Sequence, residues 1–155
     1  MGTRSTIALE FADGTVQQVY CHWDGYLSHN GAILQEYYSD PFKLRELIDL
    51  GDLSSLRPNI GQQHAFSQFE LRAEEVAGYK LLTENMCTFY GRDRGETGIE
   101  ARKYKNTDEY FDCSQQEEYD YILRTDGVWY VRCYTTNGVW LTMAEAKVTQ
   151  EECVA

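Results

Sequence analysis

The sequence is short of positive charge and has no long apolar run, and each absence disfavours a class of protein. It carries 14 basic residues against 25 acidic ones, a formal net charge of −11. Direct binding to nucleic acid needs a basic surface that displaces counterions from phosphates, so we expect none. No stretch of the sequence approaches the ~20 apolar residues that span a bilayer, and the start has no signal-peptide pattern. We therefore expect no contact with a membrane.

The cysteines lack the regular spacing of a zinc site or a disulfide framework. There are five of them, an odd number, and no two form a Cys-x-x-Cys pair. They lie at Cys21, Cys87, Cys113, Cys133 and Cys153. Reduced thiols in a cytosolic protein are the simplest explanation, so the sequence predicts no metal and no cofactor.

The sequence does have enough apolar residues for a packed core. Hydrophobic residues make up 43% of the 155, which suits one globular domain over residues 1–155. Twelve tyrosines are present. Tyrosine favours half-buried strand faces and binding surfaces, because its ring is buried while its hydroxyl finds a partner.

Both ends of the chain predict strands. Residues 5–11 alternate between apolar and polar, a turn follows, and residues 15–22 complete a hairpin. Near the C-terminus, residues 119–124, 128–134 and 139–143 alternate with Gly-containing turns and predict a three-stranded meander. Together they indicate an α+β fold: an antiparallel sheet with helices packed on one face.

The region between these strands predicts short helices. Asn30 can cap the first, and Asp40 with Pro41 opens a second that ends at Gly51. The remaining expectations are a loop over residues 52–63, one helix over 66–85, a strand over 86–90, a loop over 91–98 and a helix over 107–113.

The densest group of reactive side chains is the run from Tyr20 to Tyr26, at a predicted strand end. One interpretation is a binding loop in which Trp23 and Tyr26 stack on a ligand while His22 and Asp24 hydrogen-bond to it. The other is a structural corner in which Trp23 fills the core and Asp24 turns the chain. The sequence leaves both open.

Two other interpretations of this region, a metal site and nucleophilic catalysis, are weaker. His22, Asp24 and His29 have metal-ligand chemistry, but their spacing matches no established pattern. Cys21 and His22 could form a nucleophile and base, yet neighbours in a strand point to opposite faces.

Arginines form the second candidate group. Arg92 and Arg94 lie in the loop expected over residues 91–98, and a guanidinium fork suits phosphate or carboxylate. Pairing with neighbouring acidic residues in a solvated turn is the alternative. If the strands share one sheet, Arg4, residues 22–26 and these arginines would surround one pocket.

Several stretches resemble an uncharacterised family of tailed phages, prophages and some bacteria. They are Thr3-Arg4-Ser5, residues 11–16, Tyr20-Cys21-His22-Trp23-Asp24-Gly25-Tyr26, Asn30-Gly31, residues 50–56 and Arg92-Asp93-Arg94-Gly95-Glu96. The resemblance implies expression in a host bacterial cytoplasm during infection. It carries no established activity.

These observations favour a phage accessory protein that acts by binding, in counter-defence or host takeover. Its acidic surface could block a nucleic-acid-handling host defence protein, or the aromatic and arginine residues could sequester a nucleotide-like small molecule. The alternative is a small hydrolase or transferase that uses His22, Asp24 and Arg92, although the sequence has no recognised catalytic signature for one.

We predict that all five cysteines are reduced and that purified protein holds no zinc. Thiol titration under native and denaturing conditions, combined with metal analysis, checks this. A disulfide or stoichiometric zinc would refute it.

Overall fold

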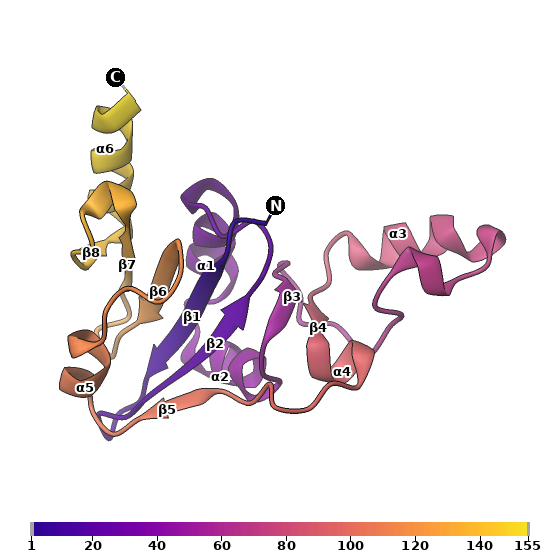
Figure 1. Cartoon of the computed structure of the whole chain (residues 1–155), viewed down its shortest axis with the longest axis horizontal. Coiled ribbons are helices and arrows are strands. Elements are labelled where there is room, and N and C mark those ends of the chain that lie inside the picture. The colour runs from indigo at the N-terminus through magenta and orange to yellow at the C-terminus, as the bar shows by residue number, and fades with distance from the viewer. Residues whose placement is uncertain (1, 155) are drawn as a thin grey trace.

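The computed structural model describes residues 2–154, with side chains described as far as residue 150. In this part of the chain, six α-helices accompany one eight-stranded mixed sheet, so the predicted α+β class is confirmed (Figure 1). The strands are β1 Ser5–Glu10, β2 Val16–Cys21, β3 Leu53–Ser55, β4 Thr88–Phe89, β5 Arg102–Tyr104, β6 Tyr119–Leu123, β7 Trp129–Cys133 and β8 Leu141–Thr142. The helices are α1 Ala32–Tyr37, α2 Pro41–Asp49, α3 Val76–Thr83, α4 Tyr90–Arg94, α5 Thr107–Asp112 and α6 Met143–Val154.

The strand order is β4-β3-β2-β1-β6-β7-β8, and β5 also pairs with β2. The predicted hairpin and meander are present, but β1 pairs in parallel with β6 and β2 in parallel with β3. The expectation of a purely antiparallel sheet is therefore wrong. Short turns fix the direction of adjacent strands, whereas nothing local fixes the direction in which a distant strand arrives.

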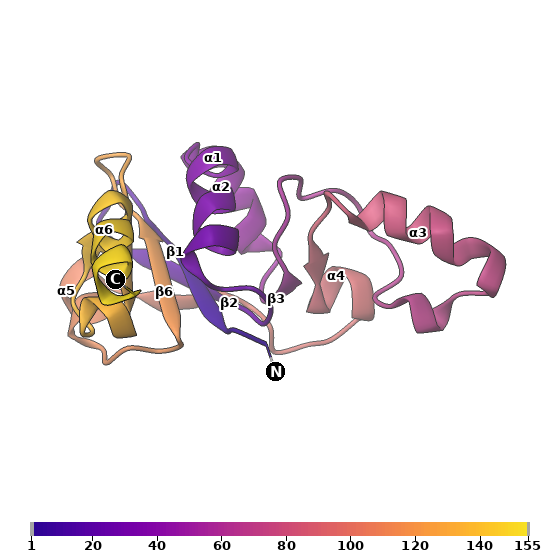
Figure 2. The ribbon, with the colours of Figure 1, turned by 90° about the horizontal axis from the view of Figure 1, so that it is seen from above.

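Helices cover both faces of the sheet rather than one. On one face α1 and α2 pack against Ile7 and Leu9 of β1 through a large apolar core (Figure 2). On the other face Tyr110 of α5 packs against Ala8 and Ile122. All six residues of β1 are buried, as expected for a central strand covered on both faces.

The start of α2 follows its sequence signals, whereas the start of the first helix does not. Asp40 accepts a hydrogen bond from the Phe42 amide at 3.0 Å, Pro41 is the first helical residue, and Gly51 adopts a φ of +85° after the helix. Asn30 does not cap α1: it lies within a π-helical turn, Leu27–Gly31, and its buried side chain donates to the Trp23 carbonyl.

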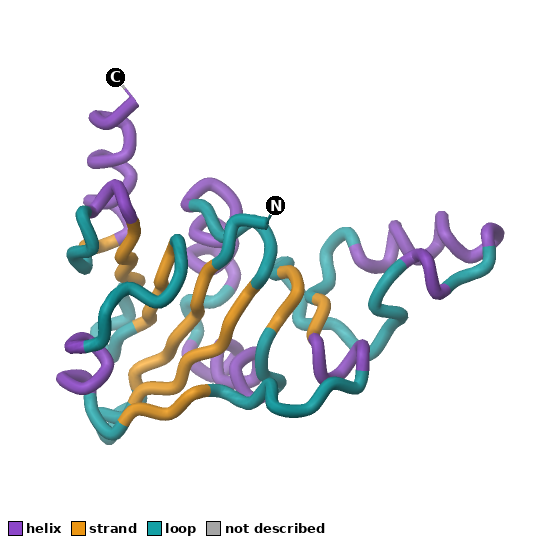
Figure 3. The backbone as a smooth tube through the Cα atoms, in the orientation of Figure 1, coloured by secondary structure: helices purple, strands orange, loops and turns teal. Residues whose placement is uncertain are grey.

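The middle of the chain departs most from prediction. The expected loop over residues 52–63 contains β3, and the loop over 91–98 begins with α4. The helix expected over 66–85 is replaced by two 3₁₀ turns and the shorter α3. We call residues 62–85 the arm, because α3 projects away from the sheet on long connecting segments (Figures 1 and 3).

A helix that spans a membrane must be both long and apolar. None of the helices described in residues 2–154 is both long enough and apolar enough to cross a bilayer.

In α3, which lies wholly within the described part of the chain, no residue is buried. The arm is therefore held by contacts at its base rather than by a core of its own.

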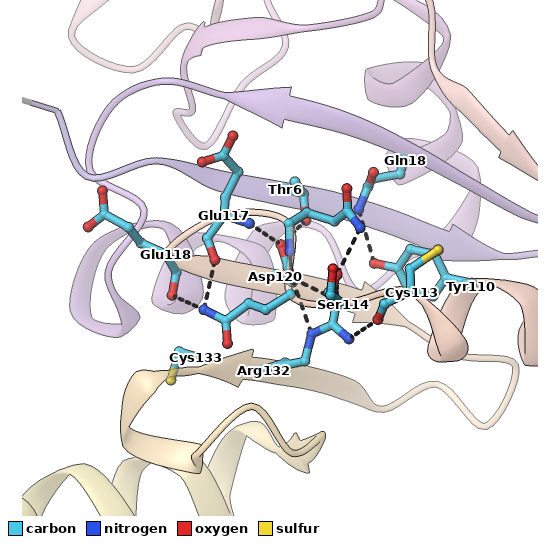
Figure 4. A network of polar contacts seen from close by, with 12 residues as sticks. Thr6, Gln18, Tyr110, Cys113, Ser114, Glu117, Glu118, Asp120, Arg132 and Cys133 are labelled. Carbon is cyan, nitrogen blue, oxygen red and sulfur yellow. Dashed lines mark hydrogen bonds and ion pairs between the residues drawn. The ribbon is translucent and has the colours of Figure 1, made fainter.

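A buried ion pair joins the two halves of the sheet. Asp120 of β6 accepts from Thr6 Oγ1 of β1 at 2.7 Å and from Arg132 Nη2 of β7 at 2.9 Å (Figure 4). Arg132 also donates through Nη1 to the Cys113 carbonyl at 2.8 Å, and the Gln116 amide donates to Asp120. The pair thus ties three strands to the loop that follows α5.

Replacing Arg132 should therefore destabilise the protein strongly. Arg132→Met keeps much of the volume but leaves the Asp120 carboxylate buried without its cation, at a cost of about 3–5 kcal/mol. Arg45→Met is the matched control, because Arg45 is exposed and lies 4.0 Å from its partner Asp49, so its loss should cost under ~0.5 kcal/mol. Urea denaturation measures both. Equal, small shifts would show that the buried pair does not stabilise the sheet.

Candidate functional site

After β2 the chain turns sharply at Asp24 and Gly25 and contacts the N-terminal segment. Asp24 adopts a left-handed φ of +57°, one of two described non-glycine residues that do so. The Gly25 amide donates to the Thr3 carbonyl at 2.8 Å, and a Cβ on Gly25 would lie 2.8 Å from Ser5 Cβ. Left-handed backbone in a residue other than glycine is strained and clusters at functional sites, which makes this corner a candidate.

The corner presents its aromatic residues to solvent. The Trp23 side chain is 43% exposed, so it does not fill the core. The His22 ring meets the Trp23 ring edge-on, with centroids 4.7 Å apart. Tyr26 is also exposed, and its hydroxyl lies 3.4 Å from Asp24 Oδ1. The corner holds Trp23 in place while leaving part of its ring free.

Trp23 and Asp24 line a cleft of ≈ 360 Å³ between the sheet edge and the arm. The sheet side of the cleft is formed by Trp23, Asp24, Ser54, Ser55, Arg57 and Thr88. The arm side is formed by Phe66, Tyr79 and Thr83. The lining combines aromatic rings, hydroxyl groups, one carboxylate and one guanidinium.

Arg57 is the cation of this cleft. Its Nη1 donates to the Leu56 carbonyl at 2.8 Å, and no carboxylate in the described part of the chain lies within 4.0 Å of its guanidinium. The arginines that do pair with a carboxylate are Arg45, Arg72, Arg92, Arg94, Arg102, Arg124 and Arg132. Arg57 therefore keeps donors available for an anion in the cleft.

Contacts outside the cleft hold the aromatic residues of its arm side in place. The Tyr79 hydroxyl donates to the Phe66 carbonyl at 3.0 Å, and burial raises the pKa of Tyr79, so the hydroxyl stays protonated at neutral pH. The Arg94 guanidinium lies 4.5 Å from the centre of the Phe66 ring and pairs with Glu96 at 2.7 Å. Arg94 thus supports an aromatic residue of the cleft without lining it.

Arg92 lies apart from the cleft and has structural partners. Its Nε donates to Asp93 at 3.0 Å, Nη1 to the Ile60 carbonyl at 2.8 Å and Nη2 to the Cys87 carbonyl at 2.9 Å. Its side chain is only 13% exposed. Arg4 is exposed just before β1 and does not line the cleft. Of the residues expected around one pocket, Trp23 and Asp24 line the cleft, whereas Arg4, His22, Tyr26, Arg92 and Arg94 do not.

The geometry supports neither nucleophilic catalysis by Cys21 nor a metal site at His22, Asp24 and His29. Cys21 is fully buried, and burial raises the pKa of its thiol to about 12, so it is not a thiolate at neutral pH. His22 points away from Cys21, with Nδ1 2.7 Å from the Tyr20 hydroxyl. His29 Nδ1 faces Asn30 instead of Asp24, and no three potential ligands converge in the described residues.

Sequence reasoning missed Arg57 and the whole arm side of the cleft. Ser54 and Ser55 lie in residues 50–56, one of the stretches that carry the family resemblance, and this was the available signal. No local sequence pattern marks Phe66 and Tyr79 as cleft residues. They reach the cleft only because the arm folds back toward the sheet edge.

The exposure of Trp23 predicts a small stability effect. Trp23→Ala should lower the free energy of unfolding by only about 1–2 kcal/mol, since part of the ring is already in water. Trp129→Ala is the control: Trp129 is 3% exposed, and its loss should cost about 3–5 kcal/mol. Thermal and chemical unfolding compare the two. A Trp23→Ala loss as large as that of Trp129→Ala would mean that Trp23 is structural.

No protein-family model, curated protein or solved structure matches this chain. Its function must therefore be inferred from the side chains that line the cleft.

Proposed function

We propose that this protein acts by binding a small, nucleotide-like anion in the cleft between the sheet edge and the arm. The observation that carries the proposal is Arg57, whose guanidinium has no carboxylate partner among the described residues and lines a cleft with aromatic rings. A planar fork of donors suits a phosphate group.

The other lining groups suit the rest of such a ligand. Trp23 offers an exposed indole on which a base can stack, and Phe66 and Tyr79 offer rings from the arm. Hydroxyl groups and the Asp24 carboxylate can hydrogen-bond to a sugar or to the edge of a base. The volume of ≈ 360 Å³ lies in the range of small-molecule sites, about 300–1,000 Å³.

Charge favours a single small anion over a polyanion. The net charge of −11 repels a long phosphate backbone, whereas one guanidinium in a cleft can still hold one phosphate group.

The cleft also favours small-molecule sequestration over an acidic surface that blocks a host protein, because the cleft is a defined site. From the resemblance to a phage family we propose that this action takes place in an infected bacterial cell, where removing a nucleotide signal would serve counter-defence.

The test is calorimetric titration with a panel of ribonucleoside monophosphates and cyclic nucleotides. We expect at least one to bind, and Arg57→Gln to weaken it about 10- to 100-fold, the effect of losing a charge-assisted hydrogen bond. Arg45→Gln, which removes an exposed arginine of α2 outside the cleft, should bind like wild type. Absence of binding across the panel, or equal binding by Arg57→Gln, contradicts the proposal.

A further inference from the structure

The side chain of Asp24 has few partners within the folded chain. Its Oδ1 lies 3.4 Å from the Tyr26 hydroxyl, and the described residues give the carboxylate no other hydrogen bond. No nitrogen of a described Lys, Arg or His side chain lies within 4.0 Å of it. Glycine would adopt the φ of +57° at lower cost, so the turn does not by itself require a carboxylate. Asp24 therefore keeps acceptor sites for a ligand of the cleft that it lines.

The backbone that carries this carboxylate is held on both sides. The Trp23 amide donates to the Ser54 carbonyl at 3.0 Å, and Asn30 Nδ2 donates to the Trp23 carbonyl at 3.1 Å. The Asn30 amide donates to the Asp24 carbonyl at 3.1 Å. A fixed backbone thus presents the Asp24 carboxylate directly beside Trp23, whose indole is 43% exposed.

The cation of the cleft lies on the same edge of the sheet. Arg57 follows Ser54 by three residues, so at most about 11 Å of extended chain separates it from the partner of Trp23. A phosphate held by Arg57 is repelled by the Asp24 carboxylate. The uncharged base of a nucleotide is therefore the part that suits Trp23 and Asp24.

The bases differ in what they offer to a carboxylate, which can only accept hydrogen bonds. Guanine presents two neighbouring donors on its Watson–Crick edge, N1–H and the N2 amino group. Adenine and cytosine each place a lone pair beside their amino group, and uracil has one N–H between two carbonyl groups. Among the bases of RNA, guanine is the one that gives each carboxylate oxygen a donor.

We propose that Asp24 makes the cleft selective for guanine nucleotides. The base stacks on Trp23, N1–H and the N2 amino group donate to the Asp24 carboxylate, and Arg57 holds the phosphate. The inference rests on the proposed function, because it names the base of the nucleotide-like anion bound in that same cleft.

Calorimetric titration with guanosine, adenosine and 2′-deoxyguanosine monophosphates tests the selection. We expect the guanosine nucleotide to bind about 10- to 100-fold more tightly than the adenosine nucleotide, the discrimination that a bidentate contact to a base edge provides. The 2′-deoxy nucleotide should bind like its ribose counterpart, because Asp24 does not contact the sugar. Equal binding of guanosine and adenosine monophosphates overturns the selection, and a weaker 2′-deoxy nucleotide would then place Asp24 on the sugar.

Asp24→Asn should reverse the selection. Asparagine tolerates a left-handed φ, so the corner is kept, and its amide offers one acceptor and one donor. This pattern matches xanthine, in which a carbonyl replaces the N2 amino group of guanine. We expect the variant to bind xanthosine monophosphate more tightly than guanosine monophosphate, whereas wild type does the opposite. The same order in variant and wild type overturns the inference.

A matched control separates hydrogen bonding from loss of charge. Asp49→Asn removes an exposed carboxylate of α2 outside the cleft and should keep the wild-type order. Equal binding of guanosine and adenosine monophosphates that is lost in Arg57→Gln would leave the anion site intact and remove only the guanine selection. Absence of binding by every nucleotide would contradict both the selection and the proposed function.

Discussion

β1 pairs with β2 along one edge and in parallel with β6 along the other, and this second pairing holds the two halves of the chain together. The contact between Thr6 and Asp120 spans 114 positions of sequence, and Arg124 reaches Glu10 at the end of the same strand pair. A slip by one residue would turn every β1 side chain to the opposite face. These polar contacts form in the observed register, and in that register β1 contributes side chains to the cores on both sides of the sheet.

Paired carboxylates and arginines also organise the less regular part of the chain. Asp52, just before β3, accepts from the Tyr20 amide and from both terminal nitrogens of Arg102, which links β3 to β2 and β5. Asp93 accepts from the amides of Phe89 and His64 and fixes α4 and the base of the arm in the same way. Together these contacts position the sheet edge and the arm around Arg57, whose guanidinium has no such partner in the described residues. Among the residues that line the cleft, Arg57 is thus a cation that this pairing leaves available.

Local signals predicted local structure. Alternation gave the hairpin and the meander strands, Asp40 and Pro41 gave the start of α2, and the crowded Tyr20–Tyr26 run pointed to two residues of the cleft, Trp23 and Asp24. The parallel pairing of β6 with β1 and the short strand β3 depend on residues far away in the sequence, so no local turn or cap predicts them. Arg92 stood out by its charge, yet its donors reach the carbonyls of Ile60 and Cys87, which only the folded chain brings close.

The central claim is that the cleft beside Trp23 and Arg57 holds a nucleotide-like anion. The three tryptophans provide internal probes, because each indole N–H gives its own signal in a ¹H–¹⁵N spectrum. Titration with a ribonucleoside monophosphate should shift the Trp23 indole and the Arg57 side-chain signals together. The indoles of Trp129 and Trp140, which do not line the cleft, should stay in place. A titration that shifts neither Trp23 nor Arg57, or that shifts Trp129 and Trp140 instead, would contradict the account.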